Sequence, residues 1–83
     1  MVFQVLNKLK WNGGLERCEI VILHRGAPGN RKTIKGSQLA GFDRHYFYLR
    51  NDRDTMIPLH RIREVILDGN LIWKRKKQPK DKD

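Results

Sequence analysis

The chain has 83 residues, of which 39% are hydrophobic and 33% are charged, a composition typical of one small globular domain rather than of a disordered chain. Its longest uninterrupted apolar run covers residues 20–23, far short of the ~20 residues that a membrane-spanning helix needs. The N-terminus has neither the basic start nor the apolar stretch of a secretory signal, which predicts an intracellular, cytoplasmic protein with no membrane contact. Cys18 is the only cysteine, which excludes an internal disulfide and a multi-cysteine zinc site.

The charge is strongly unbalanced toward basic residues. Lys and Arg number 18 against 9 Asp and Glu, which gives a net charge of +9 and a pI near 10.2. The last ten residues carry a net +4, so residues 1–73 hold the remaining +5. Proteins from hot environments are also rich in Lys and Arg, but they usually carry matching Glu, which this chain lacks. A basic body with a basic tail favours a polyanionic partner, RNA or DNA.

The N-terminal third predicts a helix, a strand and a loop. Residues 2–10 form a short amphipathic helix, because their apolar residues recur with i, i+3, i+4 and i+7 spacing. These residues are Val2, Val5, Leu6 and Leu9. The pair at 13–14 is Gly-Gly, which ends the helix. Residues 18–24 form a strand covered on both faces, because four consecutive positions are apolar. Residues 25–31 form a loop, because they are rich in Gly, Pro and Asn.

The rest of the chain predicts short strands joined by tight turns. Strands are expected at 32–35, 45–51, 55–59, 63–67 and 71–75. The segments between them predict a turn at Gly36, a bend near 37–41 and a polar turn at 52–54. Leu59 to Arg63 is compatible with a single helical turn. Asp68-Gly69 between two apolar runs is the strongest hairpin pattern in the chain.

These elements predict an α+β fold, in which a short N-terminal helix packs on a curved antiparallel sheet or a small open β-barrel of five or six strands. The short connections leave no room for β-α-β crossovers. Residues 1–75 are expected to form one globular domain. Residues 76–83 contain no apolar residue and include Pro79, so a disordered basic tail is predicted there.

The loop after the first strand is the first candidate site. Gly26 and Gly29 allow the backbone to turn and to approach a ligand closely, and Pro28 limits the freedom of the loop. Consecutive backbone N–H groups in such a turn form an anion-binding nest. The loop region adds the basic side chains of Arg25, Arg31 and Lys32. The segment lacks the phosphate-loop pattern, so a plain exposed loop with incidental basic residues is the alternative.

The second candidate site is the segment Pro58-Leu59-His60-Arg61. A lone His is more often a structural hydrogen-bonding group than a reactive one. However, the dipeptide His-Arg occurs twice, at 24–25 and at 60–61. If both copies lie at neighbouring strand ends, two imidazoles and two guanidiniums converge. Such a cluster binds a terminal or cyclic phosphate, and two imidazoles could also perform general acid–base chemistry on a phosphodiester.

Other chemistries have weaker support. The three His and Cys18 lack zinc spacing, no Asp/Glu cluster suits Mg²⁺, and no cofactor motif or catalytic triad is present, so neither a metal nor a cofactor is expected. Trp11, Tyr46, Tyr48 and Trp73 are amphipathic aromatic residues. Tyr46 and Tyr48 share a strand face with Arg50, as on sheets that stack RNA bases. The alternation does not decide whether that face is open or lies under the helix.

Five segments together resemble one small family. They are VLNKLKW near the N-terminus, HRGAPGNRK, I-x-G-S, IPLHRI and GNLIWKR. In this order and spacing they resemble an archaeal uncharacterised family that is also described as the RNA cyclic-group end recognition domain, over about residues 3–75. Members typically carry Asp where this chain has Asn30.

The resemblance implies recognition of RNA ends that carry a cyclic phosphate, in RNA repair or processing. That role was proposed from the RNA ligase-like, phosphodiesterase-like and nucleotidyltransferase domains to which family members are fused. The positions of this chain that match the family motifs are His24, Arg25, Gly26, Pro28, Gly29, Pro58, His60 and Arg61.

The leading hypothesis is therefore an RNA-binding module without catalysis of its own, with a possible RNA-processing enzyme as a second partner. Its predicted phosphate- or RNA-binding residues are His24, Arg25, Gly26, Pro28, Gly29, Arg31, Lys32, His60 and Arg61. One alternative is a metal-independent phosphodiesterase or RNase that uses His24 and His60. Another is a basic protein-interaction adaptor. A DNA-binding role is disfavoured because the only predicted helix needs its apolar face for packing.

Overall fold

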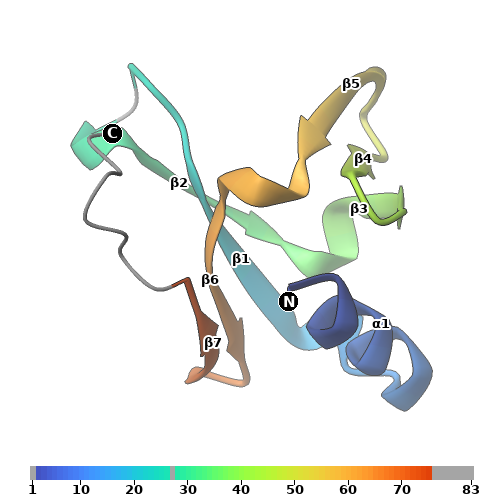
Figure 1. The fold of residues 1–83 in the computed structure, drawn as a ribbon. Coiled ribbons are helices and arrows are strands. Elements are labelled where there is room, and N and C mark those ends of the chain that lie inside the picture. Colours follow the sequence, from blue (N-terminus) through green and yellow to red (C-terminus); the bar gives the residue numbers. More distant parts are fainter. Residues whose placement is uncertain (1, 27, 76–83) are drawn as a thin grey trace.

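The computed structural model describes residues 2–26 and 28–75, without the side chains of residue 28 and of residues 52–54. The predicted tail at 76–83 lies outside the described residues. One helix is followed by seven strands and four single 3₁₀ turns, labelled η (Figure 1). The helical elements are α1 (Val2–Asn12), η1 (Leu15–Arg17), η2 (Pro28–Asn30), η3 (Gly36–Gln38) and η4 (Leu59–Arg61). The strands are β1 (Cys18–Leu23), β2 (Arg31–Lys35), β3 (Leu39–Phe42), β4 (Tyr46–Leu49), β5 (Asp52–Pro58), β6 (Ile62–Leu67) and β7 (Asn70–Lys74).

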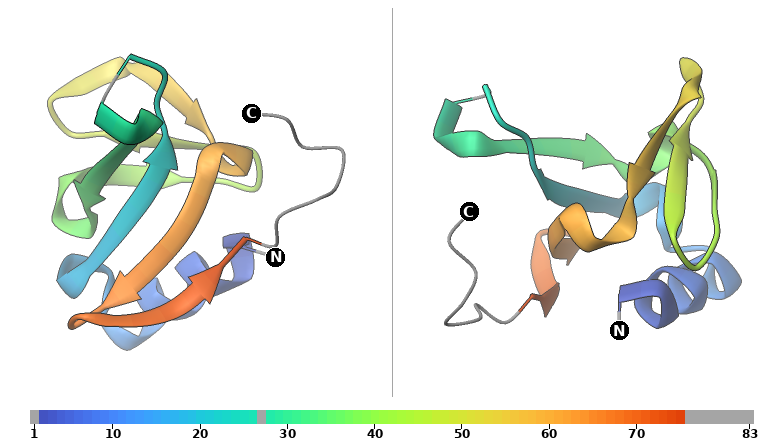
Figure 2. Two further views of the ribbon diagram at one scale, coloured as in Figure 1. Left: turned by 90° about the vertical axis from the view of Figure 1, so that its left-hand side faces the viewer. Right: turned by 45° about the horizontal axis from the view of Figure 1, so that its top comes forward.

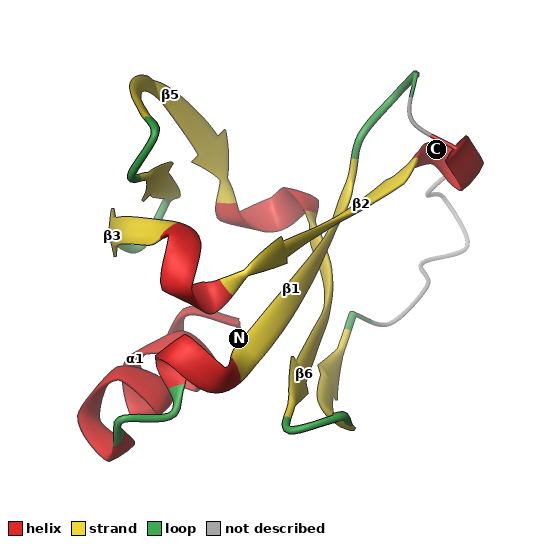
Figure 3. Ribbon diagram, turned by 180° about the vertical axis from the view of Figure 1, so that it is seen from behind, coloured by secondary structure: helices red, strands yellow, loops and turns green. Residues whose placement is uncertain are grey.

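The strands form two antiparallel sheets. The first sheet has the order β2-β1-β6-β7, and the second has the order β3-β4-β5. The chain leaves the first sheet through η3 and returns to it through η4, so each crossing is one 3₁₀ turn (Figure 3). This arrangement confirms the predicted α+β class with a curved sheet, and the two sheets do not close into a barrel.

The hydrophobic core lies between the helix and the two sheets. In β1, Ile20 and Ile22 belong to the core and the strand lies between β2 and β6, which confirms a central strand. Val21 is buried outside the core cluster and Glu19 on the same face is exposed, so the expected cover on both faces is not complete. The helix α1 lies behind the first sheet in the left-hand view of Figure 2 and buries Val2, Leu6 and Leu9. The second sheet contributes Phe47, whose side chain is fully buried. An 11-residue helix is too short to be stable alone, so this packing holds it in place.

The hairpin and the helical turn predicted from the sequence are confirmed. Asp68 and Gly69 have φ angles of 50° and 84°, and positive values at both central residues define the turn that suits the twist of a two-residue hairpin. The predicted turn after Pro58 is η4, which covers Leu59 to Arg61 and buries Leu59.

Three sequence predictions of element position were wrong. Residues 39–42 form β3 instead of the expected bend, because β3 pairs with β4 and buries Leu39 although two small residues follow it. The polar turn expected at 52–54 is the start of β5, because Asp52 pairs with Leu49 and the turn falls at 50–51. The helix continues two residues past the predicted end. The strand count therefore exceeds the five or six expected.

Gly36 lies in η3, which connects the first sheet to the second, and it tests how tightly this connection is packed. A Cβ atom at Gly36 would overlap the carbonyl oxygen of Leu15 and lie 2.6 Å from the sulfur of Cys18, which donates a 3.0 Å hydrogen bond to that same oxygen. We predict that Gly36→Ala lowers the free energy of unfolding by ~1–3 kcal/mol or more through overpacking. Gly41→Ala is the matched control, because a Cβ there meets no atom within 4 Å. Urea unfolding of both variants measures the difference, and equal stabilities would contradict the packing described here.

Candidate anion-binding site

The two His-Arg dipeptides leave the first sheet at the same end. The antiparallel ladder between β1 and β6 finishes with Ile22 opposite Ile62. His24 follows Ile22 by two residues, and His60 precedes Ile62 by two residues. In an antiparallel pair, residues at equal distances beyond a matched pair lie on the same side of it. The two copies therefore continue from neighbouring strand ends, the geometry that the sequence analysis required.

The glycine-rich loop turns tightly after β1. The backbone N–H of His24 donates a 2.9 Å hydrogen bond to the carbonyl oxygen of Asn30. Gly26 and Gly29 have φ angles of 95° and 67°, a region in which glycine is the most favourable residue. A Cβ atom at either glycine would meet no atom within 4 Å, so the backbone at these two glycines is open to an approaching ligand.

The basic side chains near this loop differ in their surroundings. Arg31 makes a 3.2 Å ion pair with Glu64 of β6, which satisfies part of its charge inside the first sheet. Lys32 is exposed on the edge strand β2, opposite Ile22. Arg25 is exposed in the loop, and Arg61 is exposed in η4. The ion pair with Glu64 thus competes with any ligand for the Arg31 guanidinium.

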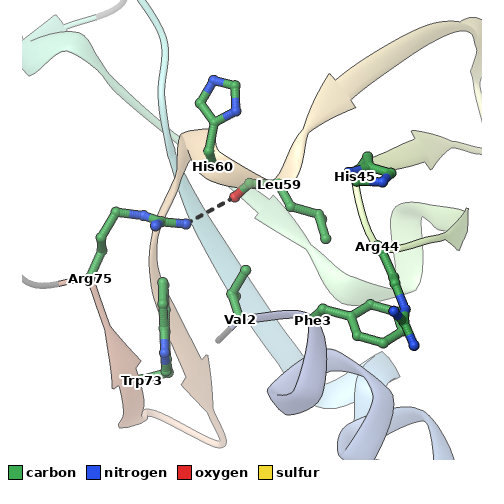
Figure 4. A pocket seen from close by; sticks show the side chains of 8 residues that line it. All are labelled: Val2, Phe3, Arg44, His45, Leu59, His60, Trp73 and Arg75. Atoms are coloured by element: carbon green, nitrogen blue, oxygen red, sulfur yellow. Dashed lines mark hydrogen bonds between the residues drawn. The ribbon is translucent and has the colours of Figure 1, made fainter.

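A cavity of about 210 Å³ lies beside η4 (Figure 4). Four segments that are distant in the sequence line it: the first turn of α1, the connection between β3 and β4, η4, and the end of β7. Its lining residues are Val2, Phe3, Arg44, His45, Leu59, His60, Trp73 and Arg75. Val2 and Leu59 lie at its centre in Figure 4, with Trp73 and Arg75 on one side and Phe3 and Arg44 on the other.

The chemistry of the cavity is basic and aromatic. Two Arg and two His contribute to the lining, and no acidic residue is among the described residues that form it. Among the side chains that the structure describes, which leave out those of residues 52–54, no three His, Cys, Asp or Glu lie close enough together to hold a metal ion. Guanidinium and imidazole groups that line a cavity suit an anionic ligand. The nearest carboxylate to this lining that the structure ties to it is Asp43, which binds the backbone N–H of His45.

Hydrogen bonds to the backbone hold Arg75 in place. Its Nε donates to the carbonyl oxygen of Ile62 at 2.9 Å, and its Nη2 donates to the carbonyl oxygen of Leu59 at 3.3 Å. The guanidinium also lies 5.1 Å from the centre of the Trp73 ring. On the other side of η4, the backbone N–H of Leu59 donates to the carbonyl oxygen of His45 at 2.8 Å. The turn η4 is therefore tied to both sheets.

Asp43 fixes the connection that carries Arg44 and His45. Its carboxylate accepts hydrogen bonds from the backbone N–H groups of His45 at 2.7 Å and Tyr46 at 2.8 Å, and from the Tyr48 hydroxyl at 2.9 Å. The backbone hydrogen bonds from His45 and Tyr46, together with that from Tyr48, lower the pKa of Asp43 below its usual 3.8. The hydrogen bond to Asp43 raises the pKa of Tyr48 above its usual 10.0.

The tyrosine face that the sequence left undecided points outward. Phe47 is fully buried, while its neighbour Tyr46 is 37% exposed. The face that carries Tyr46 and Tyr48 is therefore the open face of the second sheet, and the helix packs on the opposite side.

Sequence reasoning missed much of the cavity. Of the predicted site residues in the described part of the chain, His60 is the one that lines it. Arg44, His45 and Arg75 belong to segments that meet only through long-range packing, and no local spacing connects them. The segment GNLIWKR, which contains Trp73 and Arg75, is the local sequence pattern that pointed to one side of the cavity.

The comparisons with known proteins assign the chain to a family. Residues 1–75 match the family model described as the MJ1316 RNA cyclic group end recognition domain. The chain is 38% identical over 80 residues to the UPF0248 protein MJ1316 of Methanocaldococcus jannaschii, covering 92% of this chain and 95% of the relative. It is 40% identical over 78 residues to a UPF0248 protein of Thermococcus sibiricus, covering 90% and 85%. The chain therefore belongs to this family.

No solved structure matches the chain. Among the described residues, no helix has the length and apolar character required to cross a membrane.

The lowered pKa of Asp43 predicts a pH-dependent contribution to stability. A carboxylate whose pKa falls on folding stabilises the folded state above its unfolded pKa, and this contribution disappears as the pH falls through the folded value. We predict that Asp43→Asn melts at a lower temperature than the wild type at pH 7, and that the difference vanishes well below pH 3.8. Thermal melts of both proteins between pH 7 and values well below pH 3.8 measure this difference in melting temperature. A difference that stays constant with pH would show that the charge of Asp43 is irrelevant.

Proposed function

We propose that the protein is an RNA-binding module that recognises RNA ends bearing a phosphate or cyclic phosphate, in RNA repair or processing, and that it acts alone or beside an RNA-processing enzyme. The observation that supports this best is the common end of β1 and β6 from which both His-Arg dipeptides continue. The description of the family and the net charge of +9 agree with it.

In this proposal the terminal phosphate sits over the glycine-rich loop. The open backbone at Gly26 and Gly29 faces the phosphate, and Arg25 contributes a planar fork of N–H donors. His24 completes the pocket from the loop itself, and His60 and Arg61 complete it from the neighbouring strand end. Pro28 restricts the loop, and Lys32, Lys35 and the basic C-terminal residues attract the RNA backbone independently of its sequence.

The test uses one short RNA prepared with a 2′,3′-cyclic phosphate, a 3′-phosphate or a 3′-hydroxyl end. We predict tighter binding to a phosphorylated end, and a loss of about tenfold or more in that affinity for Arg61→Ala, as expected when one charge-assisted hydrogen bond is removed. Binding to the 3′-hydroxyl RNA should change little.

Arg17→Ala is the charge-matched control. Arg17 precedes Cys18, which pairs with Leu67 at the opposite end of the β1–β6 ladder, and it lies 3.6 Å from Asp68. Arg17→Ala removes one positive charge, as Arg61→Ala does, but at a position far from the proposed pocket. Equal, salt-sensitive binding to all three RNAs, or equal losses in both variants, would contradict end recognition.

A second candidate function, a metal-independent phosphodiesterase or RNase, uses the same strand end, next to which the chain carries His24 and His60. Two imidazoles beside one phosphodiester can act as general base and general acid. Incubation of the cyclic-ended RNA tests it. Ring opening that is lost in both His24→Ala and His60→Ala would establish an enzyme, whereas intact RNA after prolonged incubation would exclude this role.

A further inference from the structure

We propose that the cavity beside η4 binds the base and ribose of the last RNA nucleotide, so that the protein recognises a terminal nucleotide and not only its phosphate. The inference rests on the proposed function and extends it to a cavity whose lining residues, apart from His60, are not among the site residues predicted from the sequence. It requires a surface that is partly apolar, flanked by basic groups and contiguous with the proposed phosphate pocket.

The centre and walls of the cavity suit a planar apolar group. Val2 is 5% exposed and Leu59 is 4% exposed, so both present a fixed apolar surface. Phe3 and Trp73 add aromatic rings on either side. The volume of about 210 Å³ is below the ~300–1,000 Å³ of sites for larger small molecules, which limits the occupant to a single terminal group. Proteins commonly bind unpaired bases against aromatic side chains.

The rim of the cavity suits the negative charge that accompanies a nucleotide. Arg44, His45, His60 and Arg75 surround the apolar centre, and the described lining includes no carboxylate. The helix α1 also begins at this cavity with Val2, so the positive end of its dipole faces the same space. A neutral apolar ligand would gain nothing from these basic side chains, whereas a nucleotide would use both the apolar centre and the basic rim.

The basic groups are held before any ligand arrives. Arg75 is fixed by two backbone carbonyl groups and by contact with Trp73. The Arg44 guanidinium lies 5.9 Å from the centre of the Phe3 ring. The hydrogen bond that the backbone N–H of His45 donates to the Asp43 carboxylate fixes the connection between β3 and β4. Groups that are already ordered lose less entropy when they bind.

His60 links the cavity to the proposed phosphate pocket. It lines the cavity, and it belongs to the same single turn as Arg61. In Figure 4 its ring stands above the cavity and points away from Val2. One nucleotide can therefore place its base against the apolar centre while its terminal phosphate extends past His60 toward the glycine-rich loop.

Fluorescence of Trp73 tests this inference directly. The chain has two Trp residues, and Trp11 is 82% exposed on α1 outside the cavity lining, so Trp11→Phe leaves Trp73 as the only reporter. We expect RNA with a 2′,3′-cyclic phosphate end to quench Trp73 emission by stacking. Glycerol 1,2-cyclic phosphate, which has the ring but no base, should leave the emission unchanged.

In the same background, Arg44→Ala should weaken binding of the cyclic-ended RNA about tenfold, and Arg17→Ala should not. Thermal melts verify that both variants are folded. If the RNA binds with end preference but leaves Trp73 emission unchanged, the cavity assignment is overturned and the proposed function stands. If all three RNA ends quench equally and bind equally, the cavity assignment stands and end recognition is overturned.

Discussion

The architecture depends on one backbone turn, η4, through which the chain returns from the second sheet to the first. Leu59 of this turn is buried, its N–H is bonded to His45 at the end of the β3–β4 connection, and its carbonyl oxygen accepts from Arg75 beyond β7. These bonds join segments from both sheets at one point. The same turn carries His60 and Arg61, so the contacts that hold the fold also position the candidate site.

The dependence of the fold on η4 explains why the candidate site is basic and lies where the two sheets meet. A chain of 83 residues has a small core, so little of its interior is left for functional groups. Arg75 is anchored by the carbonyl oxygens of Ile62 and Leu59 and by its contact with Trp73, which fixes its guanidinium beside η4. Arg31, in contrast, pairs with the Glu64 carboxylate at 3.2 Å, so part of its positive charge is neutralised within the first sheet. A basic surface with few local acids is what a phosphate-bearing ligand requires.

Much of the fold follows from local sequence, and much of the cavity does not. The helix spacing, the apolar run of β1 and the Asp68-Gly69 turn each determine an element through interactions between near neighbours. The strand β3 was not predicted, because Ala40 and Gly41 interrupt the alternation of apolar and polar residues that marks a strand. Its pairing with β4 makes it a strand. The His-Arg dipeptides were found from composition and repetition. The cavity joins residues separated by up to 73 positions, from Val2 to Arg75, and no periodic pattern relates such residues.

The most direct test of the account is backbone amide chemical-shift mapping during titration with a short RNA that ends in a 2′,3′-cyclic phosphate. The account predicts that the largest changes fall in the loop from 24 to 32 and in η4, with a second group at the β3–β4 connection and the end of β7. Changes concentrated at the opposite end of the first sheet, around Arg17 and Asp68, would contradict it, because that end lacks both His-Arg dipeptides and the cavity.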